Sequence, residues 1–201
     1  MGSEKYLPSG PHPRPLALNE DLFRALNGAR NPLLDPLMVF FGVAGLLYFA
    51  VLWAFPLWFG GRRREAVDLP VLLILDAALV FVLKLAFGVP RPVGNPLAVP
   101  FDEVSDFAFP SGHATRAFAA ALLLTARTKD ARWGIPLFAY AVIMAVSRVY
   151  AGVHWPSDVV GGALLGMAWA YAFERLSRSR KYAEWRDRLV GRLESFRRPS
   201  S

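Results

Sequence analysis

Cysteine is absent from the 201 residues, which excludes disulfide bonds, thiolate nucleophiles and cysteine-ligated metal sites. Charged residues are also scarce, at 19% of the chain against about 25% in soluble domains. We expect no cleavable signal peptide, because the first 35 residues are rich in proline and lack an apolar core segment. The chain is 54% hydrophobic, and its apolar residues run together. This composition favours an integral membrane protein of one domain, which we expect to be all-α because its apolar runs suit membrane-spanning helices.

Positive charge exceeds negative charge, with 23 Lys and Arg against 16 Asp and Glu and a net charge of +7. The Lys and Arg residues gather in loops and in the C-terminal tail. A nucleic-acid-binding domain would carry them on a folded polar face with few apolar runs. We therefore expect the basic residues to face an anionic membrane surface and not nucleic acid.

The longest apolar run, Pro36–Phe59, has no charge over 24 residues and is the clearest candidate for a transmembrane helix. Four weaker apolar stretches follow it, and each reaches spanning length only with the polar residues at its end. These stretches are Leu69–Phe87, Phe109–Ala126, Trp133–Ala151 and Trp155–Phe173. We therefore predict five spans in a membrane domain of residues 36–174.

The two ends of the chain lie outside this domain. In residues 1–35, we expect Asn19 to cap a short helix that Gly28 ends. This helix lies either on the membrane or on the protein surface, because its leucines share one face: Leu18, Leu22 and Leu26. Residues 175–201 are basic, and their helical spacing of apolar residues predicts an amphipathic helix on the cytoplasmic leaflet. Those apolar residues are Tyr182, Trp185, Leu189, Leu193 and Phe196.

Three motifs lie at the ends of apolar stretches: Lys84–Pro92 (KLAFGVPRP), Pro110–His113 (PSGH) and Ser147–Asp158 (SRVYAGVHWPSD). Five spans place all three motifs on one side of the membrane, together with the N-terminus. Most Lys and Arg residues lie on the other side, which the positive-inside rule makes cytoplasmic. We expect a multi-pass protein of the cell (inner) membrane with its site on the extracytoplasmic face and its C-terminus in the cytoplasm.

The third motif predicts a nucleophile. Pro156 suits the first turn of a helix, so His154 and Asp158 come close where that helix begins. A carboxylate beside the imidazole fixes its tautomer and leaves the other ring nitrogen free to attack phosphorus. His113 of the second motif can give a proton to the leaving oxygen.

The remaining motif residues predict a phosphate site. Lys84, Arg91 and Arg148 supply the positive charge that phosphoryl transfer requires. Neutral donors are the backbone of Gly112 and the hydroxyl groups of Ser111 and Ser147. Zinc is disfavoured as a ligand of the two histidines, because three nearby cations would repel it, so we expect no metal or other cofactor.

The three motifs together resemble the pattern of type 2 phosphatidic acid phosphatases, the lipid phosphate phosphatases that share a site with vanadium haloperoxidases. That pattern is Lys, six residues, Arg-Pro; then Pro-Ser-Gly-His; then Ser-Arg, five residues, His, three residues, Asp. The chain matches it from Lys84 to Asp158 without departure. The resemblance implies a metal-free site in a bundle of about six helices, with His154 as nucleophile, His113 as acid and Asp158 as support. It further implies that phosphate is bound by Lys84, Arg91, Ser111, Gly112 and Arg148.

Two charged residues fall inside predicted spans and outside that pattern. Asp76 lies two helical turns from Lys84, and Arg116 lies one turn from His113. We expect either that the two side chains pair across the two spans or that Arg116 adds its positive charge to the phosphate site. A snorkelling Arg116 and a neutral, buried Asp76 are the alternatives. The acidic residues of the loop between the first two motifs are expected to keep it solvated, and these are Asp102, Glu103 and Asp106.

The predicted function is an integral membrane phosphatase that hydrolyses the terminal phosphate of a polyprenyl (undecaprenyl) pyrophosphate through a phosphohistidine. Phosphatidate, phosphatidylglycerophosphate and lipid A phosphates are the alternative substrates. A lipid-phosphate receptor or transporter would keep the cations but would not need both histidines and Asp158. A vanadate-dependent oxidase would be soluble, which the apolar spans oppose.

Overall fold

The computed structural model of the protein describes residues 17–45, 52–92, 97, 106–128 and 131–195. Every regular element in this part of the chain is helical, which confirms the predicted all-α fold. The described helices number eight and exceed the five to six of the predicted bundle, because the end helices add to it and one predicted span is divided. They are α1 (Ala17–Gly28), α2 (Asp35–Ala44), α4 (Ala54–Phe59), α5 (Arg63–Phe87), α6 (Gly112–Thr128), α7 (Gly134–Tyr150), α8 (Pro156–Ser177) and α9 (Arg180–Ser195), with a 3-10 turn at Ala131–Trp133.

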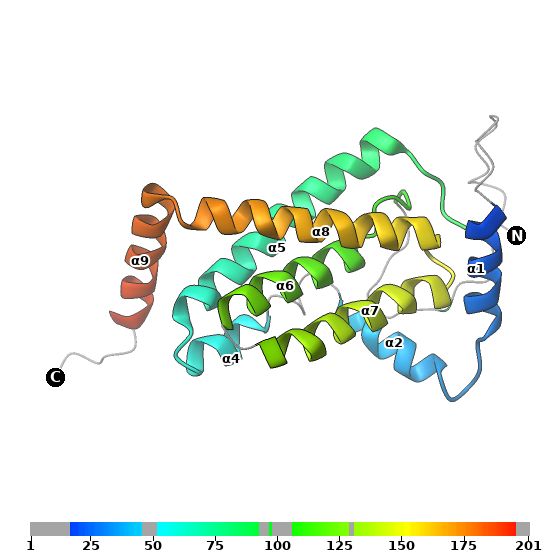
Figure 1. The fold of residues 1–201 in the computed structure, drawn as a ribbon, viewed down its shortest axis with the longest axis horizontal. Helices are drawn as coiled ribbons and strands as arrows, with labels where there is room; N and C mark the ends of the chain where they lie inside the picture. Colours follow the sequence, from blue (N-terminus) through cyan, green and yellow to red (C-terminus); the bar gives the residue numbers. More distant parts are fainter. Residues whose placement is uncertain (1–16, 46–51, 93–96, 98–105, 129–130, 196–201) are drawn as a thin grey trace, which may run out of the picture.

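Helix α6 is the centre of the bundle, and α5, α7 and α8 all pack against it along the long axis of the molecule (Figure 1). Helices α1 and α9 lie across the two opposite ends. The tightest contact joins α6 to α8, where a Cβ on Gly166 would come 2.2 Å from the carbonyl oxygen of Thr115. Gly162 faces the Ser111 carbonyl in the same way, at 2.7 Å. These two glycines, four residues apart on α8, therefore allow the close packing of α6 and α8.

The predicted span Pro36–Phe59 is wrong as a single helix. Helix α2 ends at Ala44 with Gly45 as its C-cap, and α4 begins only at Ala54. Gly45 lies against its neighbours so closely that a Cβ would come 2.4 Å from the Met144 sulfur and 2.5 Å from the His113 ring. The two pieces follow one another along the long axis, with α2 at the end near α1 and α4 at the end near α9 (Figure 1).

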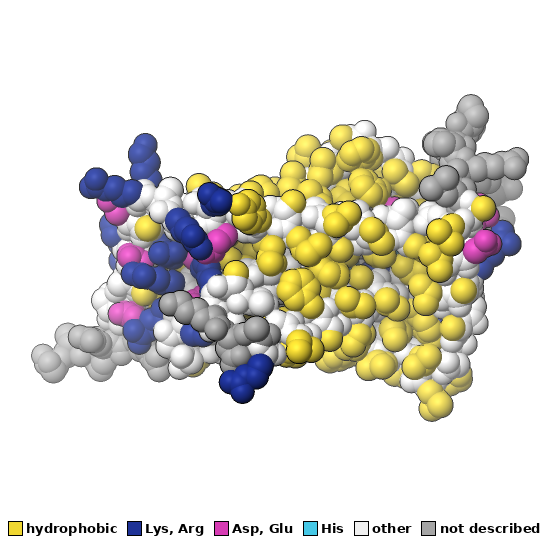
Figure 2. Space-filling view, in the orientation of Figure 1, with side chains coloured by type: hydrophobic (Ala, Val, Ile, Leu, Met, Phe, Trp, Pro, Cys, Tyr) yellow, Lys and Arg dark blue, Asp and Glu magenta, His cyan; other side chains and the backbone are white. Residues whose placement is uncertain are grey.

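The surface of the bundle is apolar between two charged ends. Figure 2 shows hydrophobic side chains over the middle of one face, while Lys and Arg gather at the end that holds α9. Large apolar side chains of three helices are strongly exposed, among them Ile74, Phe81 and Leu85 of α5, Val142 of α7, and Val160 and Leu164 of α8. Such a surface suits lipid better than water. Among the described helices, α5 is the one that is both long and apolar enough to cross a bilayer.

Helix α1 packs over the loop between α7 and α8. Phe23 is buried with its ring 5.1 Å from that of Trp155, centroid to centroid. The prediction that Asn19 caps its own helix is wrong, because α1 already begins at Ala17. Asn19 instead accepts a hydrogen bond from the backbone N–H of Ser157 at 2.9 Å and so satisfies a donor in the first turn of α8. Leu18 and Leu22 stay exposed on the other side of α1, so contact with lipid remains a prediction for that face.

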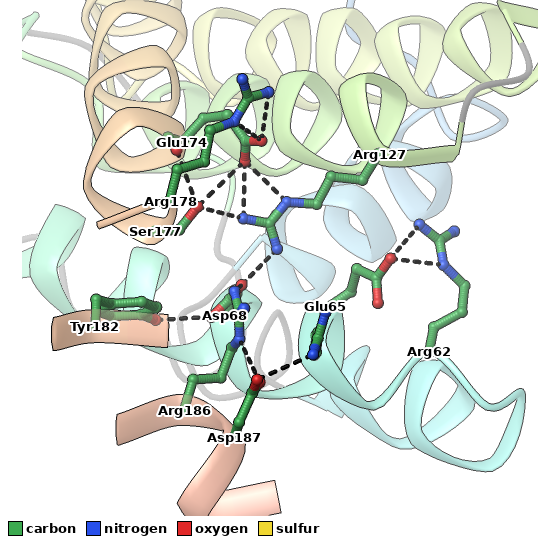
Figure 3. Close-up of polar contacts among 11 residues, drawn as sticks. Arg62, Glu65, Asp68, Arg127, Glu174, Ser177, Arg178, Tyr182, Arg186 and Asp187 are labelled. Atoms are coloured by element: carbon green, nitrogen blue, oxygen red, sulfur yellow. Dashed lines mark hydrogen bonds and ion pairs between the residues drawn. The ribbon is translucent and has the colours of Figure 1, made fainter. Parts of the chain in front are cut away.

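Helix α9 is held across the far end of the bundle by a buried polar cluster around Asp68 of α5 (Figure 3). The Asp68 carboxylate accepts hydrogen bonds from Arg186 at 2.9 Å and from the Tyr182 hydroxyl at 2.7 Å, both on α9. It also pairs with Arg127 of α6, which donates in turn to Glu174 of α8 at 2.8 Å. Helices α5, α6 and α9 therefore meet at one carboxylate, Arg127 links α8 to it, and part of the predicted amphipathic face packs on the protein.

The outer side of α9 remains basic and partly apolar. Trp185 and Leu193 are exposed, and so are Arg180 and Lys181. Contact of α9 with the cytoplasmic leaflet therefore stays a prediction for this side of the helix. Phe196, the last residue of the predicted apolar face, lies outside the described residues.

Candidate active site

The local sequence explains why the three motifs meet at one end of the bundle. Lys84 lies in the last turn of α5, which ends at Gly88 in the left-handed conformation (φ 59°) that glycine adopts without strain. His113 lies in the first turn of α6, and Arg148 lies in the last turn of α7. His154 directly precedes α8. Because consecutive helices run in opposite directions, these positions fall at the same end.

A cavity of about 240 Å³ collects the polar side chains of the motifs. Seven of the predicted site residues line it, and they are Lys84, Arg91, Gly112, His113, Arg116, Arg148 and His154. The remaining predicted site residues do not line the cavity, and they are Asp76, Ser111, Ser147 and Asp158. Asp106 also lines the cavity, although its predicted role is only to keep a loop solvated.

His154 presents one ring nitrogen to the cavity. Its Nε2 lies 3.2 Å from Nη1 of Arg91, and because a guanidinium can only donate, Nε2 must be the acceptor, with its lone pair directed at this cavity-lining arginine. Nδ1 then carries the proton and lies 3.5 Å from Oδ2 of Asp158. Burial first, and then the charges of Arg91, Arg148 and Lys84, lower the pKa of His154 well below its ordinary value of 6.5. His154 is therefore neutral at pH 7, as a nucleophile must be.

Asp158 belongs to both the site and the start of α8. Its Oδ2 accepts a hydrogen bond from the backbone N–H of Trp155 at 2.8 Å, while Pro156 occupies the first turn. The carboxylate thereby satisfies a donor that a helix N-terminus leaves without an intrahelical partner. The Asp158 carbonyl also accepts from the backbone N–H of Ser111 at 3.1 Å, which fastens the PSGH loop to α8.

His113 is oriented by α2. Its Nε2 lies 3.0 Å from the carbonyl oxygen of Gly42, and since a carbonyl only accepts, Nε2 carries a proton. The ring is buried but lines the cavity. Nδ1 is thus the atom from which a protonated His113 would transfer its proton to a leaving oxygen.

The cations are arranged around Asp106. Lys84 donates to Oδ2 of Asp106 at 2.7 Å, and Arg91 pairs with the other carboxylate oxygen. Both cations also donate to backbone carbonyls, Lys84 to Phe107 at 2.6 Å and Arg91 to Val153 at 2.6 Å. Partial burial acts to raise the pKa of Asp106, but its hydrogen bonds from Lys84 and Arg91 hold that pKa below its ordinary value. Two cations suited to phosphate therefore share a carboxylate in this structure.

This arrangement predicts that Asp106→Asn will strengthen the binding of small phosphate-like anions. The substitution removes one negative charge, while the backbone carbonyls still orient Lys84 and Arg91. At a half-exposed position we expect about 1 kcal/mol, or about a fivefold lower inhibition constant for orthovanadate. The exposed Asp21→Asn on α1 is the control and should change nothing. A higher inhibition constant for Asp106→Asn would mean that the carboxylate positions the cations for phosphate.

The two serines of the motifs differ from their predicted role as donors. Ser147 is buried, and its hydroxyl donates within α7 to the carbonyl of Met144 at 2.7 Å. Ser111 is buried as well, and its hydroxyl has no hydrogen-bond partner among the described residues. Neither hydroxyl lines the cavity, so a role on phosphate remains a proposal for Ser111 and is not supported for Ser147.

The expected pairing of Asp76 with Arg116 is not formed. Asp76 is fully buried, and its two carboxylate oxygens have no hydrogen-bond partner within the described part of the chain. Arg116 instead donates through Nε and Nη2 to the carbonyl of Gly45, at 3.3 Å each. Its guanidinium lines the cavity, as the other expectation required.

Acidic and imidazole side chains are not clustered as metal ligands at this site. Among the described residues, no group of three or more His, Asp or Glu side chains is placed to hold a metal ion. The chemistry available from the cavity-lining residues is that of one neutral histidine, a second histidine, four cationic side chains and the Asp106 carboxylate that pairs with two of them. Such a set suits nucleophilic attack on a phosphoryl group whose charge the cations stabilise.

Comparison with known proteins agrees with this geometry. The family model of the PAP2 superfamily matches residues 65–182, which include all three motifs. An undecaprenyl-diphosphatase of Sulfolobus acidocaldarius is 32% identical over 154 residues, covering 75% of this chain and 74% of that protein.

Two crystal structures share the fold. Aquifex aeolicus LpxE aligns with a TM-score of 0.70 and 34% identity over 80% of this chain and 96% of its own. The transmembrane PAP2 type phosphatidylglycerolphosphate phosphatase of Bacillus subtilis aligns with a TM-score of 0.67 and 26% identity, covering 81% and 87%. The resemblance seen in the motifs is thus confirmed, and the chain is a membrane phosphatase that belongs to the PAP2 superfamily.

Proposed function

We propose that the protein releases the terminal phosphate of a polyprenyl diphosphate through a phosphohistidine on His154. The observation that carries the proposal is the unprotonated Nε2 of His154, which lies against Arg91 in a cavity that Lys84 and Arg148 also line. The similarity to a protein named undecaprenyl-diphosphatase supports the polyprenyl substrate. A phosphatidylglycerophosphate substrate is the second candidate, favoured by the similarity to the Bacillus subtilis phosphatase.

The proposed reaction has two steps. His154 Nε2 attacks the terminal phosphorus, and the bond from that phosphorus to the bridging oxygen breaks with its electron pair left on the oxygen. His113 donates a proton to that oxygen, and lipid monophosphate leaves. Water then attacks the phosphohistidine and gives a proton to His113, and inorganic phosphate is released. Lys84, Arg91 and Arg148 stabilise the charge on the phosphoryl oxygens in both steps.

We further propose that the site faces the extracytoplasmic side of the inner membrane and that α9 lies in the cytoplasm. Basic residues gather at the α9 end of the molecule (Figure 2), and the positive-inside rule assigns that end to the cytoplasm. Five crossings of the membrane, the first of them made by the divided segment 36–59, and the domain limits 1–35, 36–174 and 175–201 are part of the same proposal.

The test is phosphate release by purified protein in detergent, with EDTA present. Polyprenyl diphosphate, phosphatidate and phosphatidylglycerophosphate are compared at equal concentration. We expect release that EDTA does not abolish, with the highest kcat/KM for the polyprenyl diphosphate. A higher kcat/KM for phosphatidylglycerophosphate would select the second candidate. Folded protein that releases phosphate from none of the three would contradict the proposed activity and favour a lipid-phosphate receptor.

A further inference from the structure

A second cavity lies beside the active site, deeper in the bundle. Its volume is about 290 Å³, and its lining comes from the α2, α4, α5, α6 and α7 regions. Nearly all the lining side chains are apolar, including Leu69 and Leu73 of α5 and Met144 of α7. Among the described residues, Arg116 alone lines both this cavity and the active-site cavity. The two spaces therefore adjoin at one guanidinium.

One face of α6 forms the wall that runs from the active site into the second cavity. The lining residues of α6 fall at steps of three to four along the helix, and they are Arg116, Ala117, Ala120, Ala121 and Leu124. They extend over eight residues, or about 12 Å of helix. The alanines leave space that larger side chains would fill. The cavity thus leads away from the phosphate-binding end, toward the side of Trp53 and Trp133.

Arg116 is held at the boundary by its own contacts. Two of its nitrogens donate to the carbonyl of Gly45 at the C-terminus of α2, where a positive charge is favoured. Its Nη1 lies beside the PSGH loop, since a Cβ on Gly112 would be 3.0 Å from that atom. The guanidinium therefore connects the end of α2 to the loop that carries His113.

The position of Arg116 distinguishes two classes of lipid phosphate. A terminal phosphoryl group at His154 lies among Lys84, Arg91 and Arg148. In a lipid diphosphate a second charged phosphate follows before the chain, whereas in a lipid monophosphate the ester oxygen is bonded directly to carbon. An arginine beside an apolar space suits the first class, because a charge-assisted contact is strong where water is scarce.

We propose that Arg116 binds the second phosphate of a lipid diphosphate and that the adjoining apolar cavity receives the beginning of its hydrocarbon chain. This inference rests on the proposed function and adds the residue that selects a diphosphate over a monophosphate. The lipid monophosphate that leaves carries its charge on the phosphate that Arg116 contacts. Arg116 therefore stabilises the leaving group in addition to binding the substrate.

The first test compares two substrates with one chain, farnesyl diphosphate and farnesyl monophosphate. Arg116→Met should lower kcat/KM for the diphosphate by about 10- to 100-fold and for the monophosphate by less than about threefold. The ratio of the two rates within one sample does not depend on the fraction of folded protein. Arg180→Met, an exposed arginine of α9 at the far end, is the control and should leave both values unchanged. An equal loss for both substrates would overturn the role of Arg116.

The second test separates this inference from the proposed function. Methylenediphosphonate and methylphosphonate are compared as inhibitors, with whichever lipid phosphate the protein hydrolyses as the reporter substrate. Arg116→Met should weaken inhibition by the diphosphonate about tenfold or more and leave the monophosphonate unaffected. Wild-type protein that hydrolyses phosphatidate but no diphosphate would refute the proposed function alone. Equal inhibition constants of wild type and Arg116→Met for the diphosphonate would refute the inference.

The third test concerns the chain. Ala120→Leu places a larger side chain in the apolar cavity. We expect kcat/KM for farnesyl diphosphate to fall about tenfold relative to isopentenyl diphosphate, whose chain is shorter. An unchanged ratio of the two substrates would show that the chain lies elsewhere and would overturn that half of the proposal.

Discussion

Replacing His154 by alanine should lower phosphate release by about 10⁴-fold or more, because the variant loses the atom that forms the bond to phosphorus. Nε2 of His154 is unprotonated and lies against Arg91 of the cavity lining, while Oδ2 of Asp158 lies on the other side of the ring, 3.5 Å from Nδ1. Asp158→Asn should therefore act through His154 and lower kcat by about 10²- to 10³-fold. Release is measured with the best substrate of the panel, in EDTA.

The control for this prediction comes from the same motif. Ser147→Ala changes a buried residue whose hydroxyl bonds within its own helix, so we expect less than a threefold effect on kcat. Added imidazole should restore part of the activity of His154→Ala, because a free ring can occupy the space of the missing one. In wild-type protein, a rapid quench should trap phosphate in a form stable to alkali and labile to acid, as phosphohistidine is. Activity of His154→Ala within about tenfold of wild type would mean that water, and not His154, attacks the phosphorus.

Much of the site could be predicted because each motif also carries a helix boundary. Gly88 ends α5 just after Lys84, and Pro156 begins α8 just after His154. These local signals, together with antiparallel helices, bring distant residues to one end of the bundle. Gly162 and Gly166 of α8 are a local signal of the same kind. Small residues at helical spacing indicate a close helix contact, whichever helix is the partner.

Other features depend on contacts that no local pattern contains. The break after Ala44 was missed because the run Pro36–Phe59 is apolar throughout, and Gly45 matters only where Met144 and His113 approach it. Asp106 was assigned to a solvated loop because nothing in its neighbourhood along the chain indicates Lys84 as its partner. The one feature of the sequence that could have indicated a place for Asp106 in the site is its position between two motifs, 15 residues after Arg91.

Asp68 is the clearest residue of this kind. It lies in the first turns of α5, one residue before the predicted span Leu69–Phe87, and no local pattern marks it as a buried residue. Its side chain is fully buried, with Arg127 and Arg186 as partners from α6 and α9. Only the packing of four helices creates this cluster, so the sequence predicts the C-terminal helix on lipid and does not indicate that one side of it packs on the protein (Figure 3).

Asp68→Ala should destabilise the protein by about 3 kcal/mol, because it leaves buried guanidinium groups without their shared carboxylate. The value lies at the low end of the usual range, since Arg127 keeps Glu174 and Arg186 keeps a contact with Asp187 at 3.4 Å. For a chain of this length we expect the apparent melting temperature in detergent to fall by about 10 °C. Glu184→Gln, which breaks an exposed pair on the same helix, should shift it by less than about 2 °C.

The same variant separates stability from catalysis. Asp68 precedes Lys84 by sixteen residues on α5, or about 24 Å along the helix, so kcat of folded Asp68→Ala at low temperature should equal that of wild type. If the loss of stability comes from stranded cations, removing them with the carboxylate should recover part of it, because apolar replacement of a buried ion pair is often neutral. Asp68→Leu combined with Arg127→Met and Arg186→Met should then melt at a higher temperature than Asp68→Ala. A triple variant that melts below the single one would show that the cluster stabilises the four-helix junction through its hydrogen bonds, and not merely by neutralising charge.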